Sequence, residues 1–151
     1  MRDNTIIDKL RRSLENVRNE QGETVPFVYE DANIQNIVFD RIVPPFVACV
    51  PLTSSAVQAG HNLFRERITI AVWFADKMAG LNGDYNAEEN ERIIDECKQR
   101  AFEWAQSLTP AGELSLVSVN GAERAYLERD ANLTGYMLNV TLEEQTVYCR
   151  G

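Results

Sequence analysis

Residues 66–75, "ERITIAVWFA", are the most regular stretch of the sequence. The apolar residues that fall on every second position are Ile68, Ile70, Val72 and Phe74. This alternation is typical of a β-strand with one face in the core. Trp73 lies on the opposite face, so we expect that face to be at least partly covered.

A long helix is predicted downstream, over about residues 87–108. Its apolar positions recur at helical spacing and form one face: Ile93, Ile94, Cys97, Ala101, Trp104, Ala105 and Leu108. Charged residues occupy the other face, and "TPAG" then ends the helix. Such an amphipathic helix is expected to pack against the sheet that contains residues 66–75.

A second amphipathic helix is predicted near the N-terminus. Thr5 is a suitable N-cap, and Asp8 stands three residues later, as in a capping box. The apolar stripe that follows consists of Ile6, Ile7, Leu10, Leu14 and Val17. We expect this helix to end near Gly22, which suits a helix C-terminus.

The remaining segments are mostly strands. Before the central helix they are residues 24–31, 34–42 and 44–52, and after it residues 114–119, 122–129 and 134–149. Pro44, Pro45 and Pro51 bound the third segment and indicate an edge strand or a bend. The stretch 53–65, "TSSAVQAGHNLFR", is expected to be a loop or a short extended arm.

Together these elements give the order α-β-β-β-β-α-β-β-β. Because the strands cluster on both sides of one helix, we predict an α+β fold with a largely antiparallel sheet packed against two amphipathic helices. The 151 residues fit one domain, with a possible extended loop or arm at about residues 44–65.

The net charge of −8 and a pI near 4.7 repel phosphate backbones and disfavour binding of nucleic acid by the whole chain. A local basic patch could exist on the first helix at Arg11, Arg12 and Arg18. Because Asp8 and Glu15 lie among these arginines, a solvated face of mixed charge is the simpler interpretation.

Cys49, Cys97 and Cys149 are far apart and have no metal-binding or redox spacing. They are expected to be reduced, partly buried thiols in a reducing compartment. No apolar run approaches the roughly 18 residues of a membrane span. The N-terminal residues lack a signal-peptide core, so we expect the protein to be made in the cytoplasm and to have no membrane partner.

No motif for catalysis or cofactor binding is present. His61 is the single histidine, so it cannot form a metal site with other histidines. The sequence also indicates no nucleophile that His61 could activate. Phosphate-binding loops, dinucleotide-binding glycine patterns and nucleophile elbows are absent from the sequence. We therefore predict no catalytic residue, no cofactor and no metal ligand.

Residues 81–90, "LNGDYNAEEN", place oxygen ligands at alternate positions, as a calcium loop does. Whether the loop starts at Asn82 or at Asp84, the glycine at position 6 and the glutamate at position 12 are missing. A helix start fits better, with Asn86 as N-cap and Glu89 at N3. The residues upstream of Asn86 then form the turn.

The segments 68–108 and 126–149 carry a resemblance to a known family. A strand ending in Phe-x-Asp-Lys, a turn leading into "ENERI" and a late "D-x-N-x-TG" resemble the small tail proteins of tailed phages and prophages. The matching residues are Phe74, Asp76, Lys77, Asp84, Tyr85, Asn86, Glu89, Asn90, Glu91, Arg92, Ile93, Asp130, Asn132, Thr134, Gly135 and Cys149. The first 65 residues match in element order alone.

The element order is similar to that of tail-terminator and tail-completion proteins. This resemblance implies a non-catalytic structural protein of the virion tail or neck, which forms a homo-oligomeric ring, usually hexameric. Its implied partners are the tail-tube and connector proteins, with DNA passing through the ring without specific binding.

A ring needs a head-to-tail contact that closes on itself. Candidate suppliers are the proline-bounded segment, the loop at 53–64 and unpaired sheet edges, and the candidate interface residues are Pro44, Pro45, Pro51, His61 and Phe64. The alternatives are another head–tail adaptor or minor tail protein, a monomeric protein-binding module, or a small metal-dependent enzyme.

Overall fold

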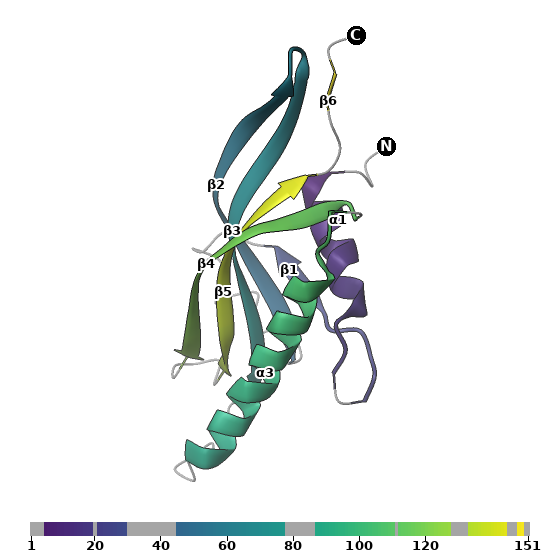
Figure 1. Ribbon diagram of the computed structural model, residues 1–151. Coiled ribbons are helices and arrows are strands. Elements are labelled where there is room, and N and C mark those ends of the chain that lie inside the picture. The colour runs from purple at the N-terminus through teal and green to yellow at the C-terminus, as the bar shows by residue number, and fades with distance from the viewer. Residues whose placement is uncertain are drawn as a thin grey trace.

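The computed structural model describes residues 5–19, 21–29, 45–77, 87–110, 112–127, 133–144 and 148–149 (Figure 1). The elements in chain order are α1 (Ile6–Ser13), the 3-10 turn η2 (Leu14–Asn16), β1 (Phe27–Tyr29), β2 (Phe46–Gly60), β3 (Leu63–Lys77), α3 (Ala87–Ser107), β4 (Leu114–Leu127), β5 (Leu133–Glu144) and β6 (Tyr148–Cys149).

The predicted α+β class is confirmed. The sheet has the strand order β1-β2-β3-β5-β4, with β6 paired to one end of β3. Among the described strands, all pairings are antiparallel except that of β1 with β2, which is parallel. The sheet is therefore largely antiparallel, as the sequence predicts.

Both helices lie on one face of this sheet. The Phe74 ring of β3 packs against Trp104 of α3, with 5.9 Å between ring centroids. The Trp104 Nε1–H donates to the Ser13 hydroxyl of α1 at 2.9 Å. The Lys9 ammonium of α1 donates to the Glu144 carboxylate of β5. Glu144 lies on the same sheet face as Phe74, because Phe74 pairs with Tyr136 and alternate residues of β5 from Tyr136 to Glu144 share one face.

The opposite face of the sheet carries Trp73, which is 7% exposed. Its ring meets Phe46 of β2 edge-to-face, with 6.0 Å between centroids. The expectation that this face is covered is confirmed.

The first helix is shorter than predicted. Its capping box forms, because the Asp8 N–H donates to the Thr5 hydroxyl and the Thr5 N–H donates to the Asp8 carboxylate. However, α1 ends at Ser13 and η2 at Asn16, well before Gly22. Val17 has an extended backbone, and Arg18 pairs with Thr24 across a tight turn around Gly22. In this turn the Asn19 side-chain oxygen accepts from the N–H groups of residues 21 and 23.

The strands after α3 divide differently from the prediction. Residues 114–119 and 122–129 were expected to be two strands, but β4 is continuous from Leu114 to Leu127. Register shifts between Leu116 and Ser118 and between Val119 and Gly121 explain the difference. Bulges at these points break the alternation of side chains without ending the pairing with β5. The last predicted strand divides into β5 and β6, and the predicted strand at 34–42 lies outside the described residues.

The proline-bounded strand is not an edge along its whole length. From Val47 to Cys49 it is an interior strand between β1 and β3. The register then shifts between Pro51 and Thr53, and from there to Gly60 β2 pairs with β3 alone among the described strands. Pro51 thus marks the point at which an interior strand becomes an edge.

Candidate interaction surface

The β2–β3 hairpin extends well beyond the rest of the sheet (Figure 1). We call its distal part, residues 51–67, the arm. Within the arm, β2 pairs with β3 in antiparallel register as far as Gly60 and Leu63. β6 adds two residue pairs on the β3 side near the tip, at Leu63 and Phe64. The segment 53–65, expected as a loop or a short arm, is therefore a regular two-stranded hairpin.

The arm folds as it does because its sequence suits a hairpin. Thr, Ser and Val in residues 53–57 tolerate an extended backbone, and Thr and Val favour it. His61 and Asn62 form the two-residue turn between the paired Gly60 and Leu63, and Asn is favoured in such turns. The Gln58 side chain closes the tip by donating to the His61 carbonyl at 3.2 Å.

The free edge of the arm carries no charge. From residue 42 to residue 64 the sequence contains no Lys, Arg, Asp or Glu, although a quarter of the whole chain is charged. Leu52 is 51% exposed and Phe64 is 44% exposed. Natural edge strands usually carry charges that prevent pairing with other chains, so this long uncharged edge lacks that protection.

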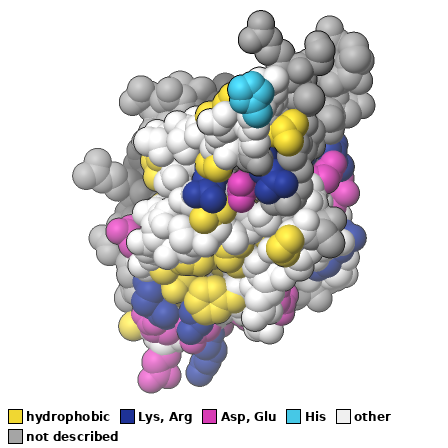
Figure 2. All heavy atoms as spheres, turned by 45° about the horizontal axis from the view of Figure 1, so that its top comes forward, with side chains coloured by type: hydrophobic (Ala, Val, Ile, Leu, Met, Phe, Trp, Pro, Cys, Tyr) yellow, Lys and Arg dark blue, Asp and Glu magenta, His cyan; other side chains and the backbone are white. Residues whose placement is uncertain are grey.

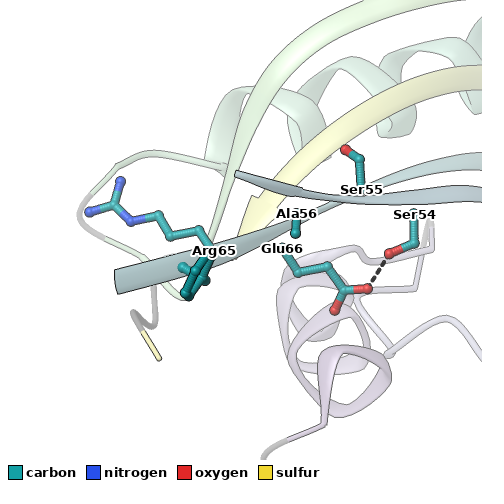
Figure 3. Close-up of a pocket in the computed structure, with 6 residues that line it drawn as sticks. Ser54, Ser55, Ala56, Arg65 and Glu66 are labelled. Carbon is teal, nitrogen blue, oxygen red and sulfur yellow. Dashed lines mark hydrogen bonds between the residues drawn. The ribbon is translucent and has the colours of Figure 1, made fainter. Parts of the chain in front are cut away.

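A shallow hollow of about 400 Å³ lies on the arm, lined by Ser54, Ser55, Ala56, Phe64, Arg65 and Glu66 (Figure 3). The Ser54 hydroxyl donates to the Glu66 carboxylate, while Ser55 and Arg65 point to the other side of the hairpin. Because the hollow is open and lies on a two-stranded ribbon, it suits contact with a protruding side chain rather than enclosure of a small substrate.

A second exposed apolar surface lies beside α3. The helix packs over β5 and β3 on one face of the sheet. On that face it leaves β4 partly uncovered. Val119 is 51% exposed, Phe102 is 44% exposed, and Ala122 is also exposed. The Phe102 ring meets Tyr136 of β5 edge-to-face at 5.6 Å. We call Phe102, Val119, Ala122 and Tyr136 the β4 face.

Figure 2 shows this side of the molecule, with the single histidine marking the tip of the arm. Hydrophobic side chains gather between the arm and a cluster of charged side chains at the lower left, where α3 begins. An apolar centre with a charged border is the usual composition of a protein interface.

The border of the β4 face carries paired charges of both signs. Arg124 pairs with Glu91 and with Asp95, the latter at 3.3 Å. Slight desolvation would raise the pKa of Asp95, but hydrogen bonds and charges from Arg124 and Lys98 outweigh it and hold this pKa below its usual value. The Asp95 carboxylate therefore stays ionised at neutral pH.

The predicted interface residues fall partly on the arm. Pro51 is exposed where the arm starts, His61 is exposed in the turn, and Phe64 is exposed on β3. Pro45 is half-buried just before β2, at the base of the hairpin rather than on the arm. Pro44 lies outside the described residues.

The structure describes only one of the two residues in the predicted cap of α3. α3 begins at Ala87, as predicted, and Glu89 is exposed in its first turn. Glu89 forms an ion pair with Arg92 at 2.7 Å. Asn86 and the turn before it lie outside the described residues.

Several residues that carry the family resemblance hold the fold together. Asn90 and Thr134 are fully buried, and Asp76 lies 3.7 Å from the guanidinium of Arg100. At Gly135 an added Cβ would lie 2.2 Å from the Phe74 carbonyl oxygen. These residues fix the junction of β3, β5 and α3, so this part of the resemblance reflects packing.

One buried ion pair was not predicted. The Lys9 ammonium lies 2.6 Å from the Glu144 carboxylate, and both residues are almost completely buried. A signal for it exists in the sequence, since Glu144 continues the apolar alternation of Leu138, Val140 and Leu142. A charged residue in such a position needs a buried partner.

The thiols of Cys49 and Cys97 are free and buried. Burial raises the pKa of Cys49 strongly and that of Cys97 to about 12. Both thiols are therefore protonated at neutral pH and unsuited to nucleophilic or metal-binding roles.

Within the described ranges, no group of three or more His, Cys, Asp or Glu side chains could hold a metal ion. No helix in the same ranges is long and apolar enough to cross a membrane. A scan against protein-family models gives no match, and a search of curated proteins finds no similar sequence.

Proposed function

We propose that this chain is a structural protein of the phage tail, of the tail-terminator or tail-completion type, which assembles into a ring through its arm. The observation that carries the proposal is the arm itself, a projecting hairpin with an uncharged free edge and exposed apolar side chains.

The energetics of the arm favour a partner. Ordering the backbone costs roughly 1–2 kcal/mol per residue, which a folded chain offsets mainly by burying apolar surface. Residues 51–56 and Phe64 are exposed, so the isolated chain obtains little burial from them. An assembly in which the arm is covered recovers this cost.

The charge balance is compatible with a ring at the end of a tail tube. The chain carries 23 acidic and 15 basic residues, so its overall charge repels DNA. A channel lined by such subunits lets DNA pass without holding it.

The proposal is tested by measuring the mass of the purified chain by light scattering and viewing it by negative-stain electron microscopy. The matched variant replaces residues 55–67 with Asn-Gly, which joins the paired Ser54 and Ile68 through a tight turn. The parent should form closed rings, and the shortened variant should be a folded monomer.

A parent that is monomeric alone and also in the presence of purified tail tubes would rule out the ring. A parent that stays monomeric but binds tubes or connectors through the arm would instead indicate an adaptor or a protein-binding module, which is the alternative function.

A further inference from the structure

We infer that the free edge of β2 in one copy lies against the free edge of β4 in the next copy. We call residues 52–56 of the arm the β2 edge and residues 114–119 the β4 edge. The inference rests on the proposed ring and names the subunit contact that would close it. The occupant of each edge is therefore a second copy of the same chain.

The two edges are opposite borders of one sheet. In the order β1-β2-β3-β5-β4, β1 covers β2 only at residues 47–49, and no described strand lies outside β4. A contact between opposite borders is head-to-tail and repeats from copy to copy, as a ring requires. Pairing of one β2 edge with another β2 edge would instead close a dimer.

The strand directions suit this contact. Successive strands from β2 through β3 and β5 to β4 are antiparallel, so β2 and β4 run in opposite directions. A rotation about an axis roughly along the strands keeps the direction of every strand. Under such a rotation, β4 meets the β2 of the next copy in antiparallel sense, and the alternation of the sheet continues across the boundary.

The two edges also lie at the same height of the sheet. One line of paired residues crosses the four strands through Thr53, Thr69, Thr141 and Ser118. The β2 edge and the β4 edge therefore meet without a large shift along the strands. A contact without such a shift closes into a ring, whereas a shift repeated at every copy would produce a helical filament.

Exposed apolar side chains gather on these edges. Five large hydrophobic side chains are exposed among the described residues, and three of them are Leu52, Val117 and Val119. Leu52 lies at the register shift of β2 and Val117 at a register shift of β4, each next to the line through Thr53 and Ser118. The contact therefore covers apolar side chains that the single chain leaves in water.

Neither edge carries a charge. Residues 42–64 and 114–122 contain no Lys, Arg, Asp or Glu, which are the usual protection of an edge strand. The contact therefore buries no charge. The register shifts interrupt the β4 edge, and so we expect a short ladder of backbone hydrogen bonds beside the packed apolar side chains.

The first test cross-links the two edges in the full chain, with Leu52→Cys and Val117→Cys combined. Within one copy these positions are three strand spacings apart, about 14 Å, which is too far for a disulfide. Mild oxidation should therefore join neighbouring copies and give covalent multimers up to the size of the parent ring on a non-reducing gel. The oxidised parent controls for the native cysteines, and neither single variant should give multimers.

The second test uses Leu52→Lys and Val117→Lys, each in the full chain. Each variant alone should be monomeric, with subunit affinity lowered by at least about tenfold. An equimolar mixture should give a one-to-one dimer, because the intact β2 edge of one variant meets the intact β4 edge of the other. Gln21→Lys is the charge-matched control, since Gln21 is exposed in the turn between α1 and β1, outside both edges. Urea unfolding checks that every variant is folded.

The mass of the parent tests the proposed ring by itself, and a monomeric parent would overturn both proposals. Four results would overturn the inference while leaving the ring intact. These are an assembling double cysteine variant that gives no covalent multimers, a single cysteine variant that gives covalent dimers, a lysine variant that assembles like the parent, and a mixture of the lysine variants that stays monomeric.

Discussion

At the scale of single residues, the structure depends on close contacts that allow little substitution. Gly135 stands where β5 passes Phe74 and Trp73 of β3, and its lack of a side chain permits that approach. Lys9 and Glu144 join α1 to the end of β5 in a region that excludes water. Neither feature belongs to the proposed interface, so changes there test the fold separately from assembly.

Gly135→Ala should destabilise the protein by roughly 1–3 kcal/mol, because the new methyl group would lie 2.2 Å from the Phe74 carbonyl oxygen. Gly121→Ala is the matched control, since the nearest atom there is 3.8 Å away. Urea unfolding measures both. Equal stability of the two variants would contradict the close approach at Gly135.

Lys9→Met or Glu144→Leu should each cost about 3–5 kcal/mol, because each leaves one buried charge without its opposite charge. The double variant Lys9→Met/Glu144→Leu should recover most of this loss, since no charge then remains buried. Urea unfolding of the two single variants and the double variant compares their free energies of unfolding. If the losses simply add in the double variant, the two side chains do not interact.

At the scale of elements, both helices and β3 could be predicted because their side-chain periodicity is strong and local. α3 begins at the predicted residue and ends one residue early. The continuity of β4 and the parallel pairing of β1 depend on contacts distant in sequence, which no local pattern encodes. The sequence identified Pro51, His61 and Phe64 as interface candidates, but it could not show that one paired hairpin carries them.

The cap of α1 should make stability depend on pH. The hydrogen bond from Thr5 lowers the pKa of Asp8, with Arg11 and Arg12 adding to the effect. A carboxyl whose pKa is lower in the folded state stabilises the fold above its unfolded pKa, near 4, and loses that contribution as pH falls further. The urea midpoint should therefore fall from pH 5 to pH 3, and less so in Asp8→Asn. An identical fall in Asp8→Asn would contradict this role.

The cap of α3 remains a prediction from the sequence. Asn86→Ala should lower stability by about 0.5–2 kcal/mol through the lost cap, with no change in the metal content of the purified protein. Thermal unfolding and elemental analysis measure the two effects. An unchanged melting temperature would contradict the cap, and calcium lost on substitution would favour the calcium-loop interpretation of residues 81–90.

At the scale of the whole molecule, the fold and the proposed function rest on different parts of the chain. Several residues that resemble tail proteins, among them Asn90, Thr134 and Gly135, fix the junction of β3, β5 and α3, whereas the proposed ring contacts lie on the arm and on the β4 edge. A shared fold does not by itself determine a role. The assembly must therefore be tested directly.

The most direct measurement is the particle mass of the parent chain compared with that of the variant in which Asn-Gly replaces residues 55–67. The account predicts a closed ring of several subunits for the parent and a folded monomer for the variant. A parent that is monomeric with and without tail tubes, or a variant that assembles as the parent does, would contradict it.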